Sequence, residues 1–275
     1  AYVTLSSKAI GSTIKLKVNG SARNFIVVHQ GKPSSVYDDS CNGTWLLMQD
    51  IYETRAWHST KTTISPSDPS KTAETHFLNQ IETEITTANE QVKLPYRKGS
   101  GTSTTVTSGS NGLSAKIFLL SATETSFDFS YMPSGEGAEL AYFKGCADNS
   151  SDSKRVAYLN GSATVWWLRS PDCNYFNFAL GVSSNGDWSR YNCSRSCGIR
   201  PALILPSTLL VSDDGTVSTN TAPSTPGSIS VPSSIMGGTN ISISGAKSSD
   251  AESKLAGYKV ERSTNGGRSW RQIYQ

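Results

Sequence analysis

The chain has 275 residues and a formal net charge of +3, and only 17% of its residues are charged. This net charge is too small to create the strong positive field by which proteins attract nucleic acids or anionic membranes. No apolar run approaches the roughly 20 residues of a membrane-spanning helix and no charged-then-apolar signal peptide opens the chain, so we expect no membrane insertion. The length favours one medium domain and a smaller second part.

The opening of the chain predicts a β-hairpin. Apolar residues alternate with lysines through Ile14–Val18, the dipeptide Asn19-Gly20 follows, and Phe25–Val28 forms a second apolar run. Strict alternation on either side of an Asn-Gly turn is typical of a hairpin. Trp45–Met48 predicts a third, shorter buried strand.

A helical region is expected next. The proline- and serine-rich segment 65–70 supplies a helix start, because Asp68 or Ser70 can cap it and proline fits a first turn. Apolar residues then recur at helical spacing, and Pro95 prevents continuation. These apolar residues are Phe77, Leu78, Ile81 and Ile85.

The middle of the chain carries weaker signals. Gly99–Gly112 is rich in glycine, serine and threonine, but it lacks the Gly-Lys-Ser/Thr ending of a phosphate-binding loop, so we interpret it as a plain loop. Lys116–Leu120 predicts a buried strand or a short helix. Glu136–Phe143 predicts a short helix that ends near Gly145.

Residues 166–203 are the most distinctive stretch. Two segments built to pack, Trp166–Pro171 and Gly198–Leu203, enclose a polar and aromatic middle. Strands are predicted at 164–168, 178–182 and 199–205, with a tight turn at 184–187.

Arg169 and Arg200 each lie between a predicted strand and a turn. At such a place a guanidinium can satisfy several loop carbonyls at once. We favour this bracing role over an anion-binding one.

Five cysteines are too few for a disulfide framework in a chain of this length, and their odd number leaves at least one unpaired. Cys173, Cys193 and Cys197 all fall in the polar middle. A Cys193/Cys197 pair could belong to a zinc site, but no Cys-x-x-Cys accompanies it and the three histidines lie far away in sequence. We therefore predict no metal ion and no cofactor.

The motif WWLRSP at 166–171, followed by GIRPALILP at 198–206, resembles the C-terminal signature of bacterial and phage proteins with a C-type-lectin-like fold. That family includes the variable proteins of diversity-generating retroelements. The opening GSTIKLKVNGSARNFIVVHQG also resembles the start of those chains. The resemblance implies an α+β, C-type-lectin-like domain over residues 1–215 whose segment between the two motifs is diversified to bind ligands.

In such systems adenines are mutagenised, so that an AAC codon for asparagine yields Asn, Tyr, Ser, Asp, Arg, Phe or Cys, but never Trp, Lys, Glu, Gln or Met. The segment Asp172–Cys197 contains no Lys, Glu, Gln or Met, and its only tryptophan is Trp188, which we interpret as part of the scaffold. The cysteines of the segment would then be products of sampling.

The resemblance implies a non-enzymatic protein of a phage tail or a bacterial cell surface that binds an unknown cell-surface protein or glycan. It implies no nucleic-acid partner and leaves a homo-oligomer open. Aromatic and arginine side chains are expected to supply the main contacts, and asparagine and aspartate side chains to adjust hydrogen bonding. The predicted ligand-binding residues are Asp172, Asn174, Tyr175, Phe176, Asn177, Asn185, Asp187, Trp188, Arg190, Tyr191, Asn192 and Arg195.

Two alternatives remain open at this point. The formylglycine-generating oxidases resemble the same fold and use paired cysteines, here Cys193 and Cys197, although no matching motif surrounds them. The chain could also be a purely structural tail component. The Glu-Pro-Asn and Trp-Asn-Asp calcium motifs of animal C-type lectins are missing, which argues against calcium-dependent sugar binding.

The last part of the sequence predicts a second module. Residues 216–227 form a linker rich in proline, serine and threonine, and residues 228–275 alternate in the manner of a small all-β segment. With an Asn-Gly-Gly turn at 265–267, this segment resembles the first half of a fibronectin type III or immunoglobulin-like module. Such modules run to about 100 residues, so we expect it to be incomplete.

Overall fold

The computed structural model describes residues 1–57, 73–85, 91–97, 105–129, 135–175, 177–221, 223–233, 236–237, 240, 242–249, 255 and 257–274. The chain divides into two compact units, Ala1–Thr219 and Asn220–Gln275. The division falls inside the expected linker 216–227. Each unit is considered by itself below.

A four-stranded antiparallel sheet of strand order β16-β4-β3-β2 forms one part of the first unit. The predicted hairpin is confirmed: Asn19 and Gly20, with φ of 48° and 78°, form the turn between β2 and β3, as a two-residue hairpin requires. The predicted third strand is confirmed as β4. The strands are β2 (Thr13–Val18), β3 (Ser21–Gln30), β4 (Thr44–Met48) and β16 (Ala202–Leu205).

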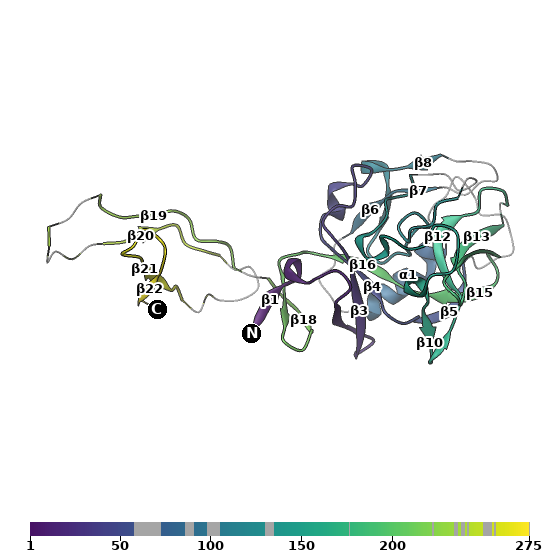
Figure 1. Cartoon of the computed structure of the whole chain (residues 1–275), viewed down its shortest axis with the longest axis horizontal. Helices are drawn as coiled ribbons and strands as arrows, with labels where there is room; N and C mark the ends of the chain where they lie inside the picture. The colour runs from purple at the N-terminus through teal and green to yellow at the C-terminus, as the bar shows by residue number, and fades with distance from the viewer. Residues whose placement is uncertain are drawn as a thin grey trace. The chain divides into compact units, whose positions relative to one another are not determined.

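A five-stranded sheet of order β14-β13-β12-β15-β5 forms the other main part, and β12, β13 and β15 lie together in Figure 1. Its strands pair antiparallel except β12 and β15, which are parallel. The predicted strand at 178–182 and the turn that follows it are confirmed. The strands are β5 (Glu53–Ala56), β12 (Trp166–Pro171), β13 (Phe178–Val182), β14 (Trp188–Asn192) and β15 (Ser196–Ile199).

The single closing strand predicted at 199–205 is wrong. The chain leaves the five-stranded sheet after Ile199 and enters the four-stranded sheet at Ala202. Arg200 and Pro201 form the crossing, and the Pro201 carbonyl accepts a hydrogen bond from Met48 N at 2.9 Å. Proline has no N–H with which to continue a ladder, which explains the break.

Smaller antiparallel sheets complete the first unit. Strand β17 joins the N-terminal strand to β18, so the first and last strands of the unit lie in one sheet. The remaining strands form two-stranded pairs, β6 with β9, β7 with β8 and β10 with β11. The bounds are β1 (Tyr2–Thr4), β6 (Val92–Leu94), β7 (Tyr96–Arg97), β8 (Val106–Thr107), β9 (Leu113–Ala115), β10 (Tyr158–Leu159), β11 (Ser162–Ala163), β17 (Leu209–Ser212) and β18 (Val217–Thr221).

The expected α+β, C-type-lectin-like fold is wrong, because the first unit is a β-rich domain. Among the described residues there is one α-helix, α1 (Ala73–Glu84), which confirms the helical spacing of Leu78 and Ile81; the expected cap at 65–70 lies outside the described residues. The short 3₁₀ turns are Leu5–Ser7, Asp39–Cys41, Gly109–Asn111, Ala141–Phe143 and Ser153–Arg155.

Two local predictions fail for tertiary reasons. The helix expected at 136–143 is reduced to a 3₁₀ turn at Ala141–Phe143. The Glu136 carboxylate pairs with Arg97, and Gly137 has a non-helical φ of 118° and lies close to the Tyr37 hydroxyl. Residues 117–120 are buried, as predicted, and Lys116 is exposed, but the segment forms neither a strand nor a helix, and a single bridge joins Phe118 to Ala202.

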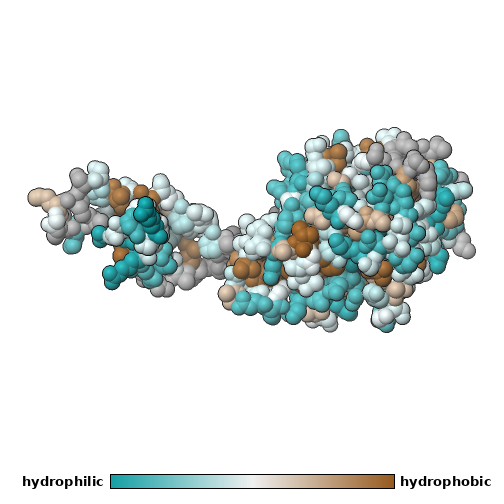
Figure 2. All heavy atoms as spheres, viewed as in Figure 1, coloured by the Kyte–Doolittle hydropathy of each residue, from teal (hydrophilic) through white to brown (hydrophobic). Residues whose placement is uncertain are grey.

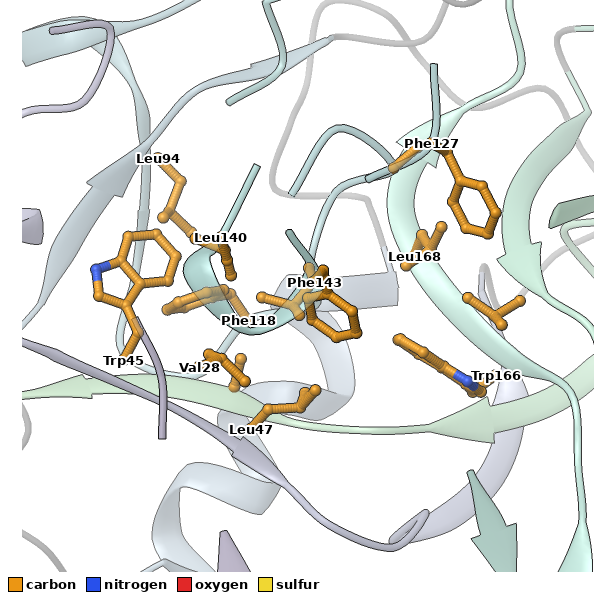
Figure 3. Packing of buried hydrophobic residues seen from close by; sticks show 14 of the residues in the cluster. Val28, Trp45, Leu47, Leu94, Phe118, Phe127, Leu140, Phe143, Trp166 and Leu168 are labelled. Carbon is orange, nitrogen blue, oxygen red and sulfur yellow. The ribbon is translucent and has the colours of Figure 1, made fainter. Parts of the chain in front are cut away.

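Strands β4 and β16 of the four-stranded sheet and β12 of the five-stranded sheet are buried on both faces. Along β4, Leu46 and Met48 enter one hydrophobic cluster, whereas Trp45 and Leu47 enter a second. Strand β12 divides in the same way, and Figure 3 shows Trp45, Leu47 and Trp166 within the second cluster. Continuous apolar runs such as those of β4 and β12 are what a strand with two buried faces requires.

The second unit contains two short antiparallel pairs and no buried residue among those described. Figure 2 shows apolar surface on this part of the chain. Its exposed large apolar side chains include Ile229, Val231, Met236, Trp270 and Ile273. The strands are β19 (Ile229–Ser230), β20 (Ser244–Gly245), β21 (Val260–Arg262) and β22 (Arg271–Tyr274).

Candidate ligand-binding surface

Strand β12 directly precedes the predicted ligand-binding segment 172–197 and is anchored by two tryptophans. Trp166 and Trp167 point to opposite faces of the sheet and are both fully buried. Their indole N–H groups donate to the backbone carbonyls of Arg155 and Arg55, each at 2.9 Å. Each ring therefore has a partner for its polar end, as a buried tryptophan needs.

Arg169 confirms its predicted bracing role and has a carboxylate partner that the sequence did not indicate. Its guanidinium donates to both carboxylate oxygens of Glu124 at 2.6 Å, and to the carbonyls of Leu119 at 2.9 Å and Pro95 at 3.2–3.3 Å. Burial alone would lower the pKa of Arg169, but the Glu124 carboxylate raises it above its ordinary value. Tyr37 donates to the same carboxylate at 2.8 Å. The cluster fixes the loops behind β12.

One signal in the sequence could have found Glu124. Ser121-Ala122-Thr123-Glu124 matches the Ser-x-x-Glu pattern of a capping box. The two reciprocal hydrogen bonds of that motif are present, Ser121 N to Glu124 at 2.8 Å and Glu124 N to the Ser121 hydroxyl at 3.1 Å. Residues 122–126 form a turn and not an α-helix, so the motif here closes a buried turn.

Arg200 also confirms its bracing role. It donates to the carbonyls of Met48 at 2.9 Å and Gln49 at 3.1 Å, and its guanidinium lies 4.9 Å from the centre of the Trp166 ring. Burial lowers its pKa to about 10. Within the part of the chain that the structure describes, its Nη1 has no hydrogen-bond partner.

Arg155 is a third buried brace, which sequence reasoning missed. Its guanidinium stacks 3.8 Å from the centre of the Phe127 ring. It also holds the turn between β13 and β14, because its Nε donates to the Gly186 carbonyl at 2.9 Å. Its other carbonyl acceptors are Thr125, Ala147 and Ser150, at 2.6–3.1 Å.

The loop that follows β12 is organised by Asp172, which the sequence placed among the ligand-binding residues. Asp172 is buried, and its carboxylate accepts from the backbone N–H groups of Asn174 at 2.7 Å and Tyr175 at 3.0 Å. Asn174 and Tyr175 themselves are exposed, whereas Asn177 is half-buried. Asp172 therefore shapes the loop and does not reach its surface. Phe176 lies outside the described residues.

The residues of β14 divide between two faces, because side chains alternate along a strand. Arg190 lies opposite Leu180 and Tyr191 lies opposite Ala179, and these two partners belong to different hydrophobic clusters. The predicted neighbours Arg190 and Tyr191 thus face opposite sides of the sheet. Strand β14 itself was not predicted.

On the first face, Arg190 joins the loop after β12. Its guanidinium lies 4.8 Å from the centre of the Tyr175 ring and 3.3 Å from the Asp172 carboxylate. The Trp188 ring, on the same face, stacks on Phe129 at 4.5 Å, in agreement with its interpretation as part of the scaffold.

On the second face, Tyr191 packs edge-on against Trp167 with ring centres 5.9 Å apart. The guanidinium of the exposed Arg195 lies 4.5 Å from the centre of the Tyr191 ring. Each face of β14 thus carries one arginine stacked on one tyrosine.

The remaining predicted residues mainly support turns. Asn185 accepts from the Ser183 hydroxyl at 2.5 Å and from Asp187 N at 3.1 Å. The Asp187 carboxylate accepts from Trp188 N at 2.7 Å. Asn192 accepts from Ser194 at 2.8–3.1 Å through its amide oxygen.

The three cysteines of the segment are buried, which corrects the view that they belong to a displayed surface. Cys173, Cys193 and Cys197 are 8%, 0% and 2% exposed. Burial raises the pKa of each thiol, that of Cys197 to about 11, and for Cys173 the nearby Arg97 offsets only part of this effect. A nucleophilic thiolate needs the opposite conditions.

No three His, Cys, Asp or Glu side chains of the described residues form a group that could hold a metal ion. No helix in the described ranges is both long and apolar enough to span a membrane.

Comparison with known proteins gives one match. A family described as "Domain of unknown function (DUF6273)" matches residues 42–207. The matched region includes the motifs at 166–171 and 198–206, the β13–β14 hairpin and every predicted ligand-binding residue. No match is found among curated proteins or solved structures.

Proposed function

We propose that this chain, which belongs to the DUF6273 family of domains of unknown function, is a ligand-binding protein of a phage tail or bacterial surface. Its binding surface is formed by the loop 174–177, the β13–β14 hairpin and the loop 193–196. The residues of this surface are open to diversification, and the ligand is a protein or glycan on a target cell.

The observation that carries the proposal is the contrast between the surface and its support. Tyr175 is 50% exposed, and Asn174, Asn185 and Arg195 are exposed as well. The backbone beneath them is held by buried groups, above all Asp172 and Arg155. Side chains presented on a rigid backbone lose little entropy on binding.

The structure narrows the set of residues that a ligand could touch. Asp172 and the three cysteines lie beneath the surface, so variation at these positions would disturb the scaffold. The oxidase-like alternative finds no support in thiols that are buried and have raised pKa values.

A cell-binding assay tests the proposal. The labelled full chain is applied to a panel of bacterial cells and glycans, and the double variant Tyr175→Ala/Arg195→Ala is expected to lose at least about tenfold in affinity, because exposed aromatic and arginine anchors dominate binding. The matched control is Tyr158→Ala/Arg23→Ala, which removes an exposed tyrosine and an exposed arginine elsewhere on the same unit.

Both double variants should melt within about 2 °C of the parent protein, since surface substitutions rarely change stability by more than about 0.5 kcal/mol. Equal losses of binding in the two variants would contradict the proposed surface. The origin of the diversity has a separate test in the coding DNA. A near-repeat of the region for 172–197 that differs only at adenines, beside a reverse transcriptase gene, is the expected finding.

A further inference from the structure

The outer edge of β14 is an open strand edge. Hydrogen bonds from Ser183 N to Asp187 O and from Cys193 N to Asn177 O fix which residues of the hairpin exchange bonds. With the observed register, Ser189 and Tyr191 direct their backbone groups toward β13. The backbone N–H and C=O groups of Trp188, Arg190 and Asn192 therefore point away from the sheet.

Two of these residues offer unused backbone groups. Arg190 N, Arg190 O and Asn192 N have no hydrogen-bond partner among the described residues, and no described strand follows β14 in its sheet. The edge at β2 is different, because Lys15 N donates to Gly215 O and Asn19 N to Glu84 O. Proteins ordinarily cover or disrupt such edges, since they pair readily with other strands.

Positive charge lies on both sides of this edge. Arg190 and Tyr175 form one side, and Arg195 and Tyr191 form the other. Arg190 has a single carboxylate contact, at 3.3 Å, and Arg195 has none within the described ranges. A strand laid along β14 would thus place successive side chains beside one arginine–tyrosine pair and then the other.

We infer that the outer edge of β14 binds an extended, acidic peptide segment of the partner protein as an additional β-strand. The backbone groups of Arg190 and Asn192 supply the main-chain hydrogen bonds, and the two arginines select carboxylate side chains on alternate faces. This inference rests on the proposed function, because it names the ligand class of the same surface.

A second copy of the chain fits this edge less well. Pairing two β14 strands around a two-fold axis at Arg190 would place the two Arg190 side chains directly opposite one another, and like charges in that position are destabilising. An axis at Tyr191 would set each Arg190 opposite Asn192, which offers the arginine no carboxylate. A glycan would make no use of the spacing of the backbone groups. An acidic strand satisfies both the hydrogen-bonding groups and the charge.

The probe is a fluorescein-labelled eight-residue peptide of alternating threonine and glutamate, whose glutamates all lie on one face of an extended strand. Its binding to the full chain is measured by fluorescence anisotropy. A peptide with glutamine in place of glutamate reports the charge requirement. Two further peptides carry N-methyl groups on one or the other alternate set of amides. Only one set can point toward β14 in a given register.

The N-methyl comparison is made with the parent protein and with Arg195→Gln, in which only the Arg190 side can select the glutamates. For this variant, one methylated peptide should lose at least about tenfold in affinity and the other should bind as the unmodified peptide does. Arg23→Gln, an exposed arginine outside the surface, is the matched control. The glutamine peptide should bind the parent protein at least about tenfold more weakly.

Two variants at one position separate the backbone from the charge. Arg190→Ala keeps the outward N–H, whereas Arg190→Pro removes it without breaking a bond to β13, because proline is tolerated on the open side of an edge strand. Arg190→Pro is expected to bind the peptide at least about tenfold more weakly than Arg190→Ala. If Arg190→Pro does not fold, the N-methyl comparison still decides.

Equal affinity of Arg195→Gln for both methylated peptides, or no binding to the parent protein at millimolar peptide, overturns the inference. So does a dimer in sedimentation that Arg190→Pro converts to a monomer, because the edge would then hold a second copy. Cell or glycan binding that depends on Tyr175 and Arg195 but not on the Arg190→Pro change would overturn the strand while leaving the proposed function intact.

Discussion

Buried arginines connect segments that are far apart in the sequence. Arg155, Arg169 and Arg200 each donate to backbone carbonyls of loops, and Arg169 alone adds a carboxylate, that of Glu124. The sequence predicted two of the three from their place before a turn. Arg155 had no such signal, because its acceptors are carbonyls whose positions depend on tertiary structure.

The buried thiols give a prediction at the residue scale. In the unfolded chain the Cys197 thiol ionises near its ordinary pKa of 9.0, and in the folded protein burial raises this pKa to about 11. Because the folded pKa is the higher of the two, ionisation of this thiol leaves the free energy of unfolding unchanged below pH 9. The free energy of unfolding then decreases as the pH rises from 9 toward 11, by up to about 1.4 kcal/mol per pH unit for each such thiol.

The measurement is urea unfolding of the full chain from pH 7 to 11. Cys197→Ala should show a shallower decline above pH 9 than the parent, since the other buried thiols still contribute. Iodoacetamide at pH 7.5 should leave Cys193 and Cys197 unmodified until the protein is unfolded. Rapid labelling of either cysteine in the folded state would revive the oxidase-like reading.

At the scale of elements, the β13–β14 hairpin depends on one turn. Gly186 has a φ of 84°, and a Cβ at this position would lie 2.0 Å from the Asp152 carbonyl oxygen. The Arg155 guanidinium holds the same residue through its carbonyl. The turn is therefore packed against a distant loop and is more than a local reversal of the chain.

Gly186→Ala should destabilise the first unit by about 2 kcal/mol or more, because the methyl group adds a collision with backbone to the cost of a positive φ. Gly161→Ala is the matched control. Its φ is 81° and nothing lies within 4 Å of its Cβ position, so a destabilisation of about 1 kcal/mol is expected. Urea unfolding measures both, and equal costs would show that the contact with Asp152 does not constrain the hairpin.

At the scale of the whole molecule, the two units differ in how they are stabilised. The first encloses two hydrophobic clusters, one of which includes Trp45 and Trp166, whereas none of the described residues of the second is buried. Two-stranded pairs without a core are marginally stable in water. The exposed apolar side chains of the second unit, among them Trp270 and Ile273, therefore contribute little burial energy to its stability.

Limited proteolysis should reflect this difference. Trypsin is expected to cut first after Lys or Arg residues between 220 and 275, for instance at Lys259 or Arg268, and to leave a resistant fragment close to residues 1–219. Mass spectrometry identifies the fragments, and Lys15 and Lys17 within the paired β2 strand serve as internal controls. Cleavage at β2 as early as at the second unit would contradict the expectation.

Elements with strong local signals were predictable from the sequence. The Asn19-Gly20 turn, the apolar run of β4 and the buried strands β12 and β13 were predictable because alternation, turn chemistry and apolar runs depend on near neighbours alone. The fold class was not predictable in this way. The lectin-like α+β fold was expected from the resemblance, and it is wrong because the first unit is β-rich. The short helix expected at 136–143 is replaced by contacts of Glu136 with Arg97 and of Gly137 with Tyr37.

Which residues of 172–197 are exposed depends on the tertiary structure. Composition marked the whole segment as polar and displayable, but burial depends on what packs against it. Arg97 donates to Cys173 and to the Pro171 carbonyl, and the backbone N–H of Tyr175 donates to Asp172. Pairing of β14 with β13 sends Arg190 and Tyr191 to opposite faces of the sheet. The pairing partner of a strand and the cover over a loop are set by segments far away in sequence, and for that reason no local pattern carried them.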